Sequence, residues 1–213
     1  MTQKLKVNPY HFFILKRSFD LIFSILGILV LFPLTVGIAI GTNLISNGPV
    51  IFKHKRVGKN GKEFTLIKFR TMRMGAEKEQ KTLRYLNEVD GPVFKIRDDP
   101  RFVGIGSFLA KTGLDELPQL INVIRGEMSM VGPRPLPVSE AKKLTKAQKV
   151  RELVKPGMTS SWVVKGAHSL TFRKWMKLDQ EYMRNADFGI DIQILIKTAE
   201  IVLKQIPKQL LKR

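Results

Sequence analysis

The residues from Leu21 to Phe52 include no charged side chain. Their core, LIFSILGILVLFPLTVGIAIGT, is longer than the roughly 18 to 20 apolar residues that a membrane helix needs. A secretory signal peptide would have a shorter apolar region and a small-residue cleavage site, which this stretch does not match. The chain is therefore expected to be embedded in a membrane.

Basic residues lie on both sides of this apolar run. Lys16 and Arg17 precede it and Lys53 follows it, so the positive-inside bias places both ends on the cytoplasmic face. Pro33 lies near its middle, where a proline removes a backbone donor and kinks or breaks a helix. These features favour a re-entrant helical hairpin that enters and leaves by one face. The alternative is a straight spanning helix that tolerates a proline kink.

Asp20 lies at the start of the apolar run, at helical spacing from Lys16 and Arg17. Pairing with these cations near the membrane surface would spare the carboxylate the roughly 2.5 to 3.5 kcal/mol that a charge costs at the membrane centre. We therefore interpret Asp20 as an interfacial anchor rather than a catalytic residue.

The chain is strongly basic, with 37 Lys and Arg against 18 Asp and Glu and a formal net charge of +19. Such an excess predicts a polyanionic partner, which can be an anionic lipid, a phosphorylated substrate or a nucleic acid. A nucleic-acid partner is not expected, because it would leave the apolar run unexplained and the chain has no recognisable motif for one. The absence of cysteine excludes disulfides and thiolate metal sites.

A β-hairpin is predicted around the dipeptide Asn60-Gly61, which readily adopts positive φ between two mixed apolar and basic stretches. In the sequence KFRTM, Lys68 and Arg70 flank a phenylalanine, so they would share one face of a strand. This basic region is expected to anchor the protein to anionic headgroups. Lys68 and Arg70 are also candidates for binding a substrate phosphate.

Three further helices are predicted. An exposed helix rich in Glu, Lys and Gln is expected over residues 76–88, and a polar helix from Ser139 to about Lys155. The C-terminal stretch GIDIQILIKTAEIVLKQIPKQLLKR begins apolar and becomes amphipathic and basic. This last pattern is typical of a helix that lies on a membrane surface.

Two adjacent carboxylates, Asp115 and Glu116, precede Pro118 in KTGLDELPQL. Apolar residues at positions 114, 117, 121 and 124 have a helical period, and a proline is accepted only in the first turn. The helix should therefore start near residues 115–117, where free N–H groups and the helix dipole stabilise negative charge, including a bound phosphate. The alternative is that Asp115 only caps the helix.

Arg134 lies between two prolines in the loop GEMSMVGPRPLP. A guanidinium held this stiffly suits bidentate binding of a phosphate. An ordinary surface arginine in a proline-rich loop is the other interpretation.

Taken in order, several stretches resemble the bacterial sugar transferases, the monotopic polyprenyl-phosphate phosphoglycosyl transferases. The resemblance runs from about Lys16 to Leu203. The stretches are KRSFD, GPVIFKHKRVGKNGKEFTLIKFRTM, GPVFKIRDDPR, LDELPQLINVIRGEMSMVGPRP and KPGMTSSW. The block from DELPQL to GPRP is the most specific of them.

The resemblance implies an α+β, mostly helical fold in two parts. Residues 1–49 would form the N-terminal segment and a re-entrant membrane helix hairpin broken at Pro33. Residues 50–213 would form a small cytosolic catalytic domain on the membrane surface, with a short β-hairpin and amphipathic helices at the interface. The protein would lie at the cytoplasmic face of the bacterial inner membrane, and a homo-oligomer is compatible with this arrangement.

The implied activity is transfer of a sugar-1-phosphate from a UDP-sugar to undecaprenyl phosphate, which releases UMP and initiates assembly of a cell-surface glycan or exopolysaccharide. Asp115 would be the nucleophile that attacks the β-phosphorus and forms a covalent phosphosugar-aspartate. Glu116 would assist as a ligand of Mg²⁺, or as part of a carboxylate pair with Asp115 that positions the metal. Arg134 would bind a substrate phosphate. The alternative is a non-catalytic basic protein that binds anionic lipid or regulates a polysaccharide assembly complex.

This chain departs from the family pattern at three positions. Relatives commonly read FLRKTSLDE where this chain reads FLAKTGLDE, so Ala110 and Gly113 replace an arginine and a serine. Ala167 stands where relatives often have the arginine of GLWQVSGRS. Two cations expected near the substrate are therefore missing here.

Overall fold

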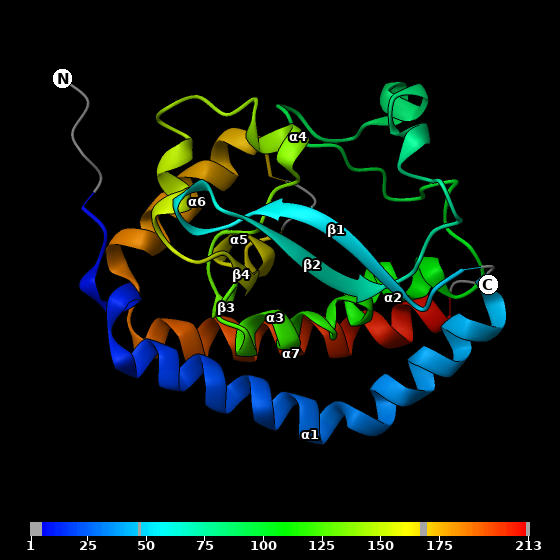
Figure 1. The fold of residues 1–213 in the computed structure, drawn as a ribbon, viewed down its shortest axis with the longest axis horizontal. Coiled ribbons are helices and arrows are strands. Elements are labelled where there is room, and N and C mark those ends of the chain that lie inside the picture. The colour runs from blue at the N-terminus through cyan, green and yellow to red at the C-terminus, as the bar shows by residue number, and fades with distance from the viewer. Residues whose placement is uncertain (1–5, 47, 167–169, 212–213) are drawn as a thin grey trace.

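The computed structural model describes residues 6–46, 48–166 and 170–211. The described residues are mostly helical, with two small two-stranded sheets (Figure 1). In chain order, the helices and strands are α1 (Ile14–Ile45), β1 (Ile51–Val57), β2 (Glu63–Phe69), α2 (Gly106–Thr112), α3 (Gln119–Ile124), β3 (Ser129–Val131), α4 (Val138–Ala141), β4 (Gly157–Thr159), α5 (Ser161–Val164), α6 (Phe172–Asn185) and α7 (Phe188–Leu210). Short 3₁₀ turns cover Pro9–Phe12, Lys59–Gly61, Lys78–Gln80, Thr82–Leu86, Leu114–Glu116 and Lys149–Leu153.

α1 contains the apolar run as one continuous helix of 32 residues, with Pro33 inside it. The helix bends near its middle, and both of its ends turn toward the rest of the protein (Figure 1). By length and composition, it is the one helix among the described residues able to cross a membrane. Only 11% of its most apolar window is buried, so α1 is not the core helix of a water-soluble domain.

The predicted β-hairpin is confirmed. β1 and β2 pair antiparallel from Ile51 opposite Phe69 to Val57 opposite Glu63. Asn60 has a φ of 56° in the 3₁₀ turn that joins the two strands. Only glycine and a few short polar residues adopt this left-handed conformation readily, which explains the Asn-Gly dipeptide there.

Two helix predictions from the sequence are wrong. Residues 76–88 form only the 3₁₀ turns Lys78–Gln80 and Thr82–Leu86. The apolar side chains of Tyr85 and Leu86 remain exposed, so they supply no packing that would stabilise a longer helix. The helix expected from Ser139 to about Lys155 stops at Ala141 and is followed by the turn Lys149–Leu153. Thr145 explains the interruption, because its side chain accepts from the N–H of Gln148 and the Gln148 side chain accepts from the N–H of Thr145.

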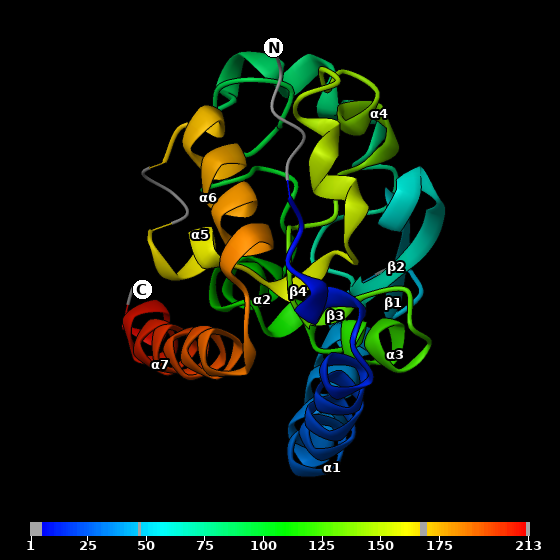
Figure 2. The ribbon, with the colours of Figure 1, turned by 90° about the vertical axis from the view of Figure 1, so that its left-hand side faces the viewer.

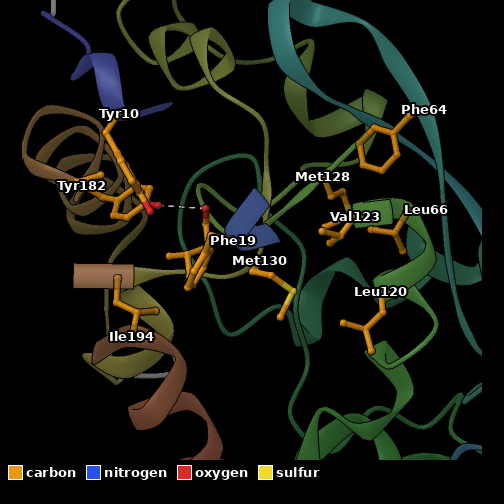
Figure 3. Packing of buried hydrophobic residues seen from close by; sticks show 12 residues of the cluster. Tyr10, Phe19, Phe64, Leu66, Leu120, Val123, Met128, Met130, Tyr182 and Ile194 are labelled. Carbon is orange, nitrogen blue, oxygen red and sulfur yellow. Dashed lines mark hydrogen bonds between the residues drawn. The ribbon is translucent and has the colours of Figure 1, made fainter. Parts of the chain in front are cut away.

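The core lies between the hairpin, α3, β3 and the C-terminal helices. One cluster joins Phe19 of α1 to Phe64 and Leu66 of β2 and to residues of α3 and β3 (Figure 3). Tyr182 of α6 packs into the same cluster, with its hydroxyl oxygen 3.0 Å from the carbonyl oxygen of Val131. α1 packs against α3, and α2 packs against α7. Figure 2 shows α1 and α7 nearly end on, both on the same side of the protein.

Candidate active site

The two adjacent carboxylates lie in a turn between α2 and α3. Gly113 ends α2 with a φ of 77°, and Leu114–Glu116 then forms one 3₁₀ turn. Leu114 is buried in a cluster with Leu109 and Phe69, which fixes the turn against the hairpin. The predicted helix is therefore present, but it starts as a 3₁₀ turn and becomes α-helical only at Gln119. No side-chain cap is formed at either start, so Asp115 does not act as the helix cap.

Asp115 pairs with Lys68 of β2. Lys68 Nζ lies 3.0 Å from Asp115 Oδ2, and Asp115 is only 3% exposed. Burial raises the pKa of the Asp115 carboxyl, the positive charge of Lys68 opposes that rise, and the negative charge of Glu116 adds to it. Lys68, and more weakly the positive charge of Arg134, favour the ionised carboxylate at this buried position.

Glu116 pairs with Arg134 of the proline-rich loop. Arg134 Nη1 lies 3.1 Å from Glu116 Oε1, and the Arg134 guanidinium lies 6.0 Å from the centre of the Trp162 ring. The negative charge of Glu116 is the largest cause of the raised pKa of Arg134. Asp115 and Glu116 thus each face one cation that sequence analysis had singled out.

Arg70 lies one residue beyond the end of β2, and its side chain approaches the same Phe52 ring as Lys68 does. Lys68 Nζ and Arg70 Cζ lie 6.0 and 5.6 Å from the centre of the Phe52 ring. The Nε of Arg70 donates to the carbonyl of Pro49 at 2.8 Å. The structure therefore brings Lys68, but not Arg70, into an ion pair with the carboxylate turn.

Two further cations near this pair were missed by sequence analysis. Arg56 of β1 donates from Nη1 to the carbonyl of Pro135 at 3.1 Å, and burial and the charge of Arg134 lower its pKa to about 10. Burial and Arg134 also lower the pKa of Lys95 to about 8, and Glu116 opposes that shift. The alternation of side chains along β1 could have indicated which face Arg56 lies on. Lys95 lies in a loop, where no repeating pattern of apolar residues indicates the direction of a side chain.

The charged residues predicted at the membrane face inward. Lys16 Nζ lies 3.0 Å from Asp20 Oδ1, which confirms the predicted pairing. The same Asp20 oxygen accepts from Ser129 Oγ at 2.9 Å and from the N–H of Met130 at 3.0 Å. Arg17 instead donates to the carbonyls of residues 123 and 124 at 2.6 and 2.7 Å, at the end of α3. Asp20 is thus a buried link between α1 and β3.

The carboxylate turn fits a magnesium ion in its donor chemistry. Asp115 and Glu116 offer hard oxygen ligands. The described residues contain no larger group, of three or more His, Asp or Glu, that could hold a metal by protein ligands alone. Mg²⁺ commonly takes one or two carboxylates and completes its shell with water and substrate phosphates. The turn offers two carboxylates, each beside a cation, and so matches that number of protein ligands.

The three departures from the family pattern have different structural settings. Gly113 adopts a φ of 77°, a conformation that glycine adopts with less strain than serine. Ala110 lies in the last turn of α2, and the adjacent Lys111 pairs with Asp98. Ala167 lies outside the described residues.

Comparison with known proteins shows the family of the chain. The model of the bacterial sugar transferase family matches residues 11–205. The chain is 39% identical over 204 residues to the galactosyl transferase CpsE of Streptococcus agalactiae serotype III, a match covering 95% of this chain and 45% of that protein. It is 37% identical over 195 residues to the undecaprenyl-phosphate galactose phosphotransferase of Salmonella typhimurium, a match covering 90% of this chain and 41% of that protein. It is 36% identical over 195 residues to the uncharacterized sugar transferase EpsL of Bacillus subtilis, a match covering 89% of this chain and 88% of that protein. The chain therefore spans less than half of the first two relatives and most of the third.

Proposed function

The chain belongs to the bacterial sugar transferase family, and from that membership we propose that it transfers a sugar-1-phosphate from a UDP-sugar to undecaprenyl phosphate, with release of UMP. The observation that carries the proposal is the pair of ion pairs at one turn, Lys68 with Asp115 at 3.0 Å and Arg134 with Glu116 at 3.1 Å. A buried carboxylate beside cations suits a nucleophile that must approach a negatively charged phosphate.

The proposed first step uses Asp115 as the nucleophile. One of its carboxylate oxygens attacks the β-phosphorus of the UDP-sugar, and the bond from that phosphorus to the oxygen bridging the two phosphates breaks. UMP leaves with the electron pair, and the sugar phosphate stays on Asp115 as an acyl phosphate. In the second step a phosphate oxygen of undecaprenyl phosphate attacks the same phosphorus, and the Asp115 carboxylate is released with the product, undecaprenyl diphosphate sugar.

The neighbouring residues neutralise and orient the phosphates. Lys68 opposes the rise in the pKa of Asp115 that burial causes, which favours the ionised carboxylate before the attack, and it is free to contact a phosphate once Asp115 is acylated. Arg134, whose side chain is 42% exposed, presents a planar guanidinium that binds two phosphate oxygens at once. Asp115 and Glu116 would hold Mg²⁺, which when bound supplies further neutralisation of the diphosphate charge.

The sugar is proposed to be a hexose such as galactose or glucose. The segment GPVFKIRDDP resembles the branch of the family that uses these sugars. One relative is named a galactosyl transferase and another a galactose phosphotransferase. The product would initiate assembly of a cell-surface polysaccharide.

We propose that the membrane attachment is re-entrant and cytoplasmic. The two ends of α1 turn toward the same body of the protein (Figure 1), as expected of a segment that enters and leaves by one face. α7 would lie on the membrane surface, because exposed Phe188, Ile196, Leu203 and Leu210 recur at a spacing of seven or eight residues along one side of this helix. Anionic lipids would contact the basic residues beside these helices.

The test is release of UMP by the purified protein in lipid with Mg²⁺, undecaprenyl phosphate and a panel of UDP-sugars. We expect release with one sugar, loss of release in Asp115→Asn and strong impairment in Glu116→Gln. The covalent intermediate is tested separately by mass spectrometry of the Asp115 peptide after acid quenching without the lipid acceptor. No release with any sugar from folded, lipid-bound protein would favour a non-catalytic membrane-surface protein instead.

A further inference from the structure

Two buried side chains of α6 lie one helical turn apart on the same face and lead to the same residue of the site. Trp175 is 4% exposed and Asp179 is 2% exposed. Residues four apart on a helix lie one above the other. Asp179 begins a series of contacts that reaches the backbone of Arg134. Trp175 begins a second series that reaches the guanidinium of Arg134.

The first series of contacts holds the backbone of Arg134. Arg151 Nη2 lies 2.8 Å from Asp179 Oδ2 and donates to the carbonyl oxygen of Arg134, also at 2.8 Å. Both Arg151 and Asp179 are buried, so water screens the ion pair between them only a little. The hydrogen bond from the charged Arg151 to the Arg134 carbonyl is stronger than one between neutral groups. Arg151 thus fixes the position from which the Arg134 side chain extends.

The second series of contacts supports the guanidinium of Arg134. The rings of Trp162 and Trp175 stack with centroids 4.5 Å apart and an angle of 14° between their planes. The Arg134 guanidinium lies 6.0 Å from the centre of the Trp162 ring, within the range of a cation–π contact. The position of Trp162, and with it the surface beneath the guanidinium, therefore depends on Trp175.

We propose that α6 positions the phosphate-binding Arg134 at both ends, through Asp179 and Arg151 at its carbonyl and through Trp175 and Trp162 at its guanidinium. These four are positioning residues, since they act on the substrate only through Arg134, and the inference rests on the function proposed above. An arginine whose geometry is fixed before the substrate arrives loses less conformational freedom on binding, which strengthens binding of the diphosphate.

The test replaces Arg151 with Gln and measures kcat and KM for the UDP-sugar. We expect KM to rise about tenfold with a smaller change in kcat, because the lost contact weakens binding of a phosphate that stays bound throughout the reaction. Arg151→Lys, which retains a donor and the charge, should recover part of the loss. Trp162→Leu should also raise KM, since it removes the ring beneath the guanidinium.

Arg101→Gln is the matched control. Arg101 is as buried as Arg151, pairs with Asp99 at 2.6 Å and donates to the carbonyl of Ala76 at 2.9 Å. Its contacts resemble those of Arg151, but they end at a loop residue rather than at Arg134. We expect Arg101→Gln to lower the melting temperature about as much as Arg151→Gln and to leave KM within about twofold of the wild type.

A double-mutant cycle separates positioning from general stability. If Arg151 acts through Arg134, Arg151→Gln should change kcat/KM little in an Arg134→Gln background, so the two effects should be strongly non-additive. Equal effects in both backgrounds, or a rise in KM no larger than that of Arg101→Gln, would overturn the inference while the wild type still released UMP. Absence of UMP release by the wild type would overturn the proposed function and this inference together.

Discussion

Lys16 Nζ lies 2.6 Å from Asp191 Oδ2, so an ion pair joins the first turn of α1 to the first turn of α7, 175 residues away in the chain. The hydroxyls of Tyr10 and Tyr182 donate to the two oxygens of Asp191 at 3.0 and 2.6 Å. Asp191 is completely buried, and these three donors satisfy its carboxylate. The pair therefore fixes α1 to the C-terminal half of the protein.

Lys16→Met should destabilise the protein strongly. Removing one partner of a buried ion pair leaves the other charge buried without compensation, which costs about 3 to 5 kcal/mol. The measurement is thermal unfolding followed by circular dichroism in lipid nanodiscs. Lys177→Met is the control, because Lys177 and Glu181 form an exposed pair at 3.9 Å and such pairs contribute less than about 1 kcal/mol. Similar melting temperatures for the two variants would contradict a central role for Lys16.

Asp115→Asn should reduce release of UMP by at least about a thousandfold, since an amide cannot replace the carboxylate as nucleophile. The fold should be retained, because asparagine has the same shape. Asp98→Asn is the control: Asp98 is highly exposed and pairs with Lys111, so its loss should leave the rate nearly unchanged. Activity that persists in Asp115→Asn would assign the nucleophile to another residue.

The site shows what sequence reasoning can reach. Asp115 and Glu116 were found from their place before Pro118, and Lys68 from strand alternation, because each lies in or beside an element with a recognisable period. The contacts of Arg134 with Trp162 and Arg151 were not found, since they join loops and helices far apart in the chain and depend on tertiary packing. Asp191 was missed for the same reason, because its partners come from three separate elements.

The helix wrongly predicted over residues 76–88 shows the limit of composition as a predictor of helices. Residues 76–88 are rich in good helix formers, yet their apolar side chains Tyr85 and Leu86 stay exposed and the segment forms only 3₁₀ turns. Composition therefore predicted an element that packing does not support. α7, by contrast, was predicted as a helix close to its observed bounds. The apolar run was expected to form a helical hairpin broken at Pro33 and is observed as one continuous helix, α1, which begins at Ile14.

His11 should make the folded state sensitive to acid. Burial and the charge of Lys16 lower its pKa from 6.5 to about 4, so the folded protein favours the neutral ring. A lowered pKa gives stability that is present above pH 6.5 and is lost as the pH falls toward 4, in total about 3 kcal/mol. His11→Phe keeps a ring against Tyr182 without a titrating group. The gap in melting temperature between wild type and His11→Phe should therefore change between pH 6.5 and pH 4, in favour of the variant at low pH. A constant gap would show that His11 does not change its protonation.

Gly106→Ala should disturb the turn that carries the carboxylates. A Cβ on Gly106 would lie 1.9 Å from the carbonyl oxygen of Thr71, a backbone atom that cannot move aside without shifting the strand end. We expect a loss of at least about 2 kcal/mol in stability, together with reduced activity, because α2 leads directly to Asp115. Gly37→Ala in α1 is the control, since a Cβ there meets nothing within 4 Å. Equal melting temperatures for the two variants would contradict the close approach of α2 and the end of β2.

The orientation of α1 can be tested with single cysteines, because the natural chain contains none. Lys6 lies before α1 and Lys55 lies in β1 beyond its other end, so the two positions flank the apolar run. If α1 enters and leaves by one face, Lys6→Cys and Lys55→Cys should both react with a membrane-impermeant maleimide in inverted vesicles, and neither should react in right-side-out vesicles. A spanning helix would put the two cysteines on opposite sides, and one would then be labelled in each preparation. Leu29→Cys, in the apolar run, should resist labelling in both preparations, which controls for leakage of the reagent. Labelling of both flanking positions from the cytoplasmic side would establish the re-entrant arrangement, and with it the placement of Asp115 on the side where UDP-sugars are available.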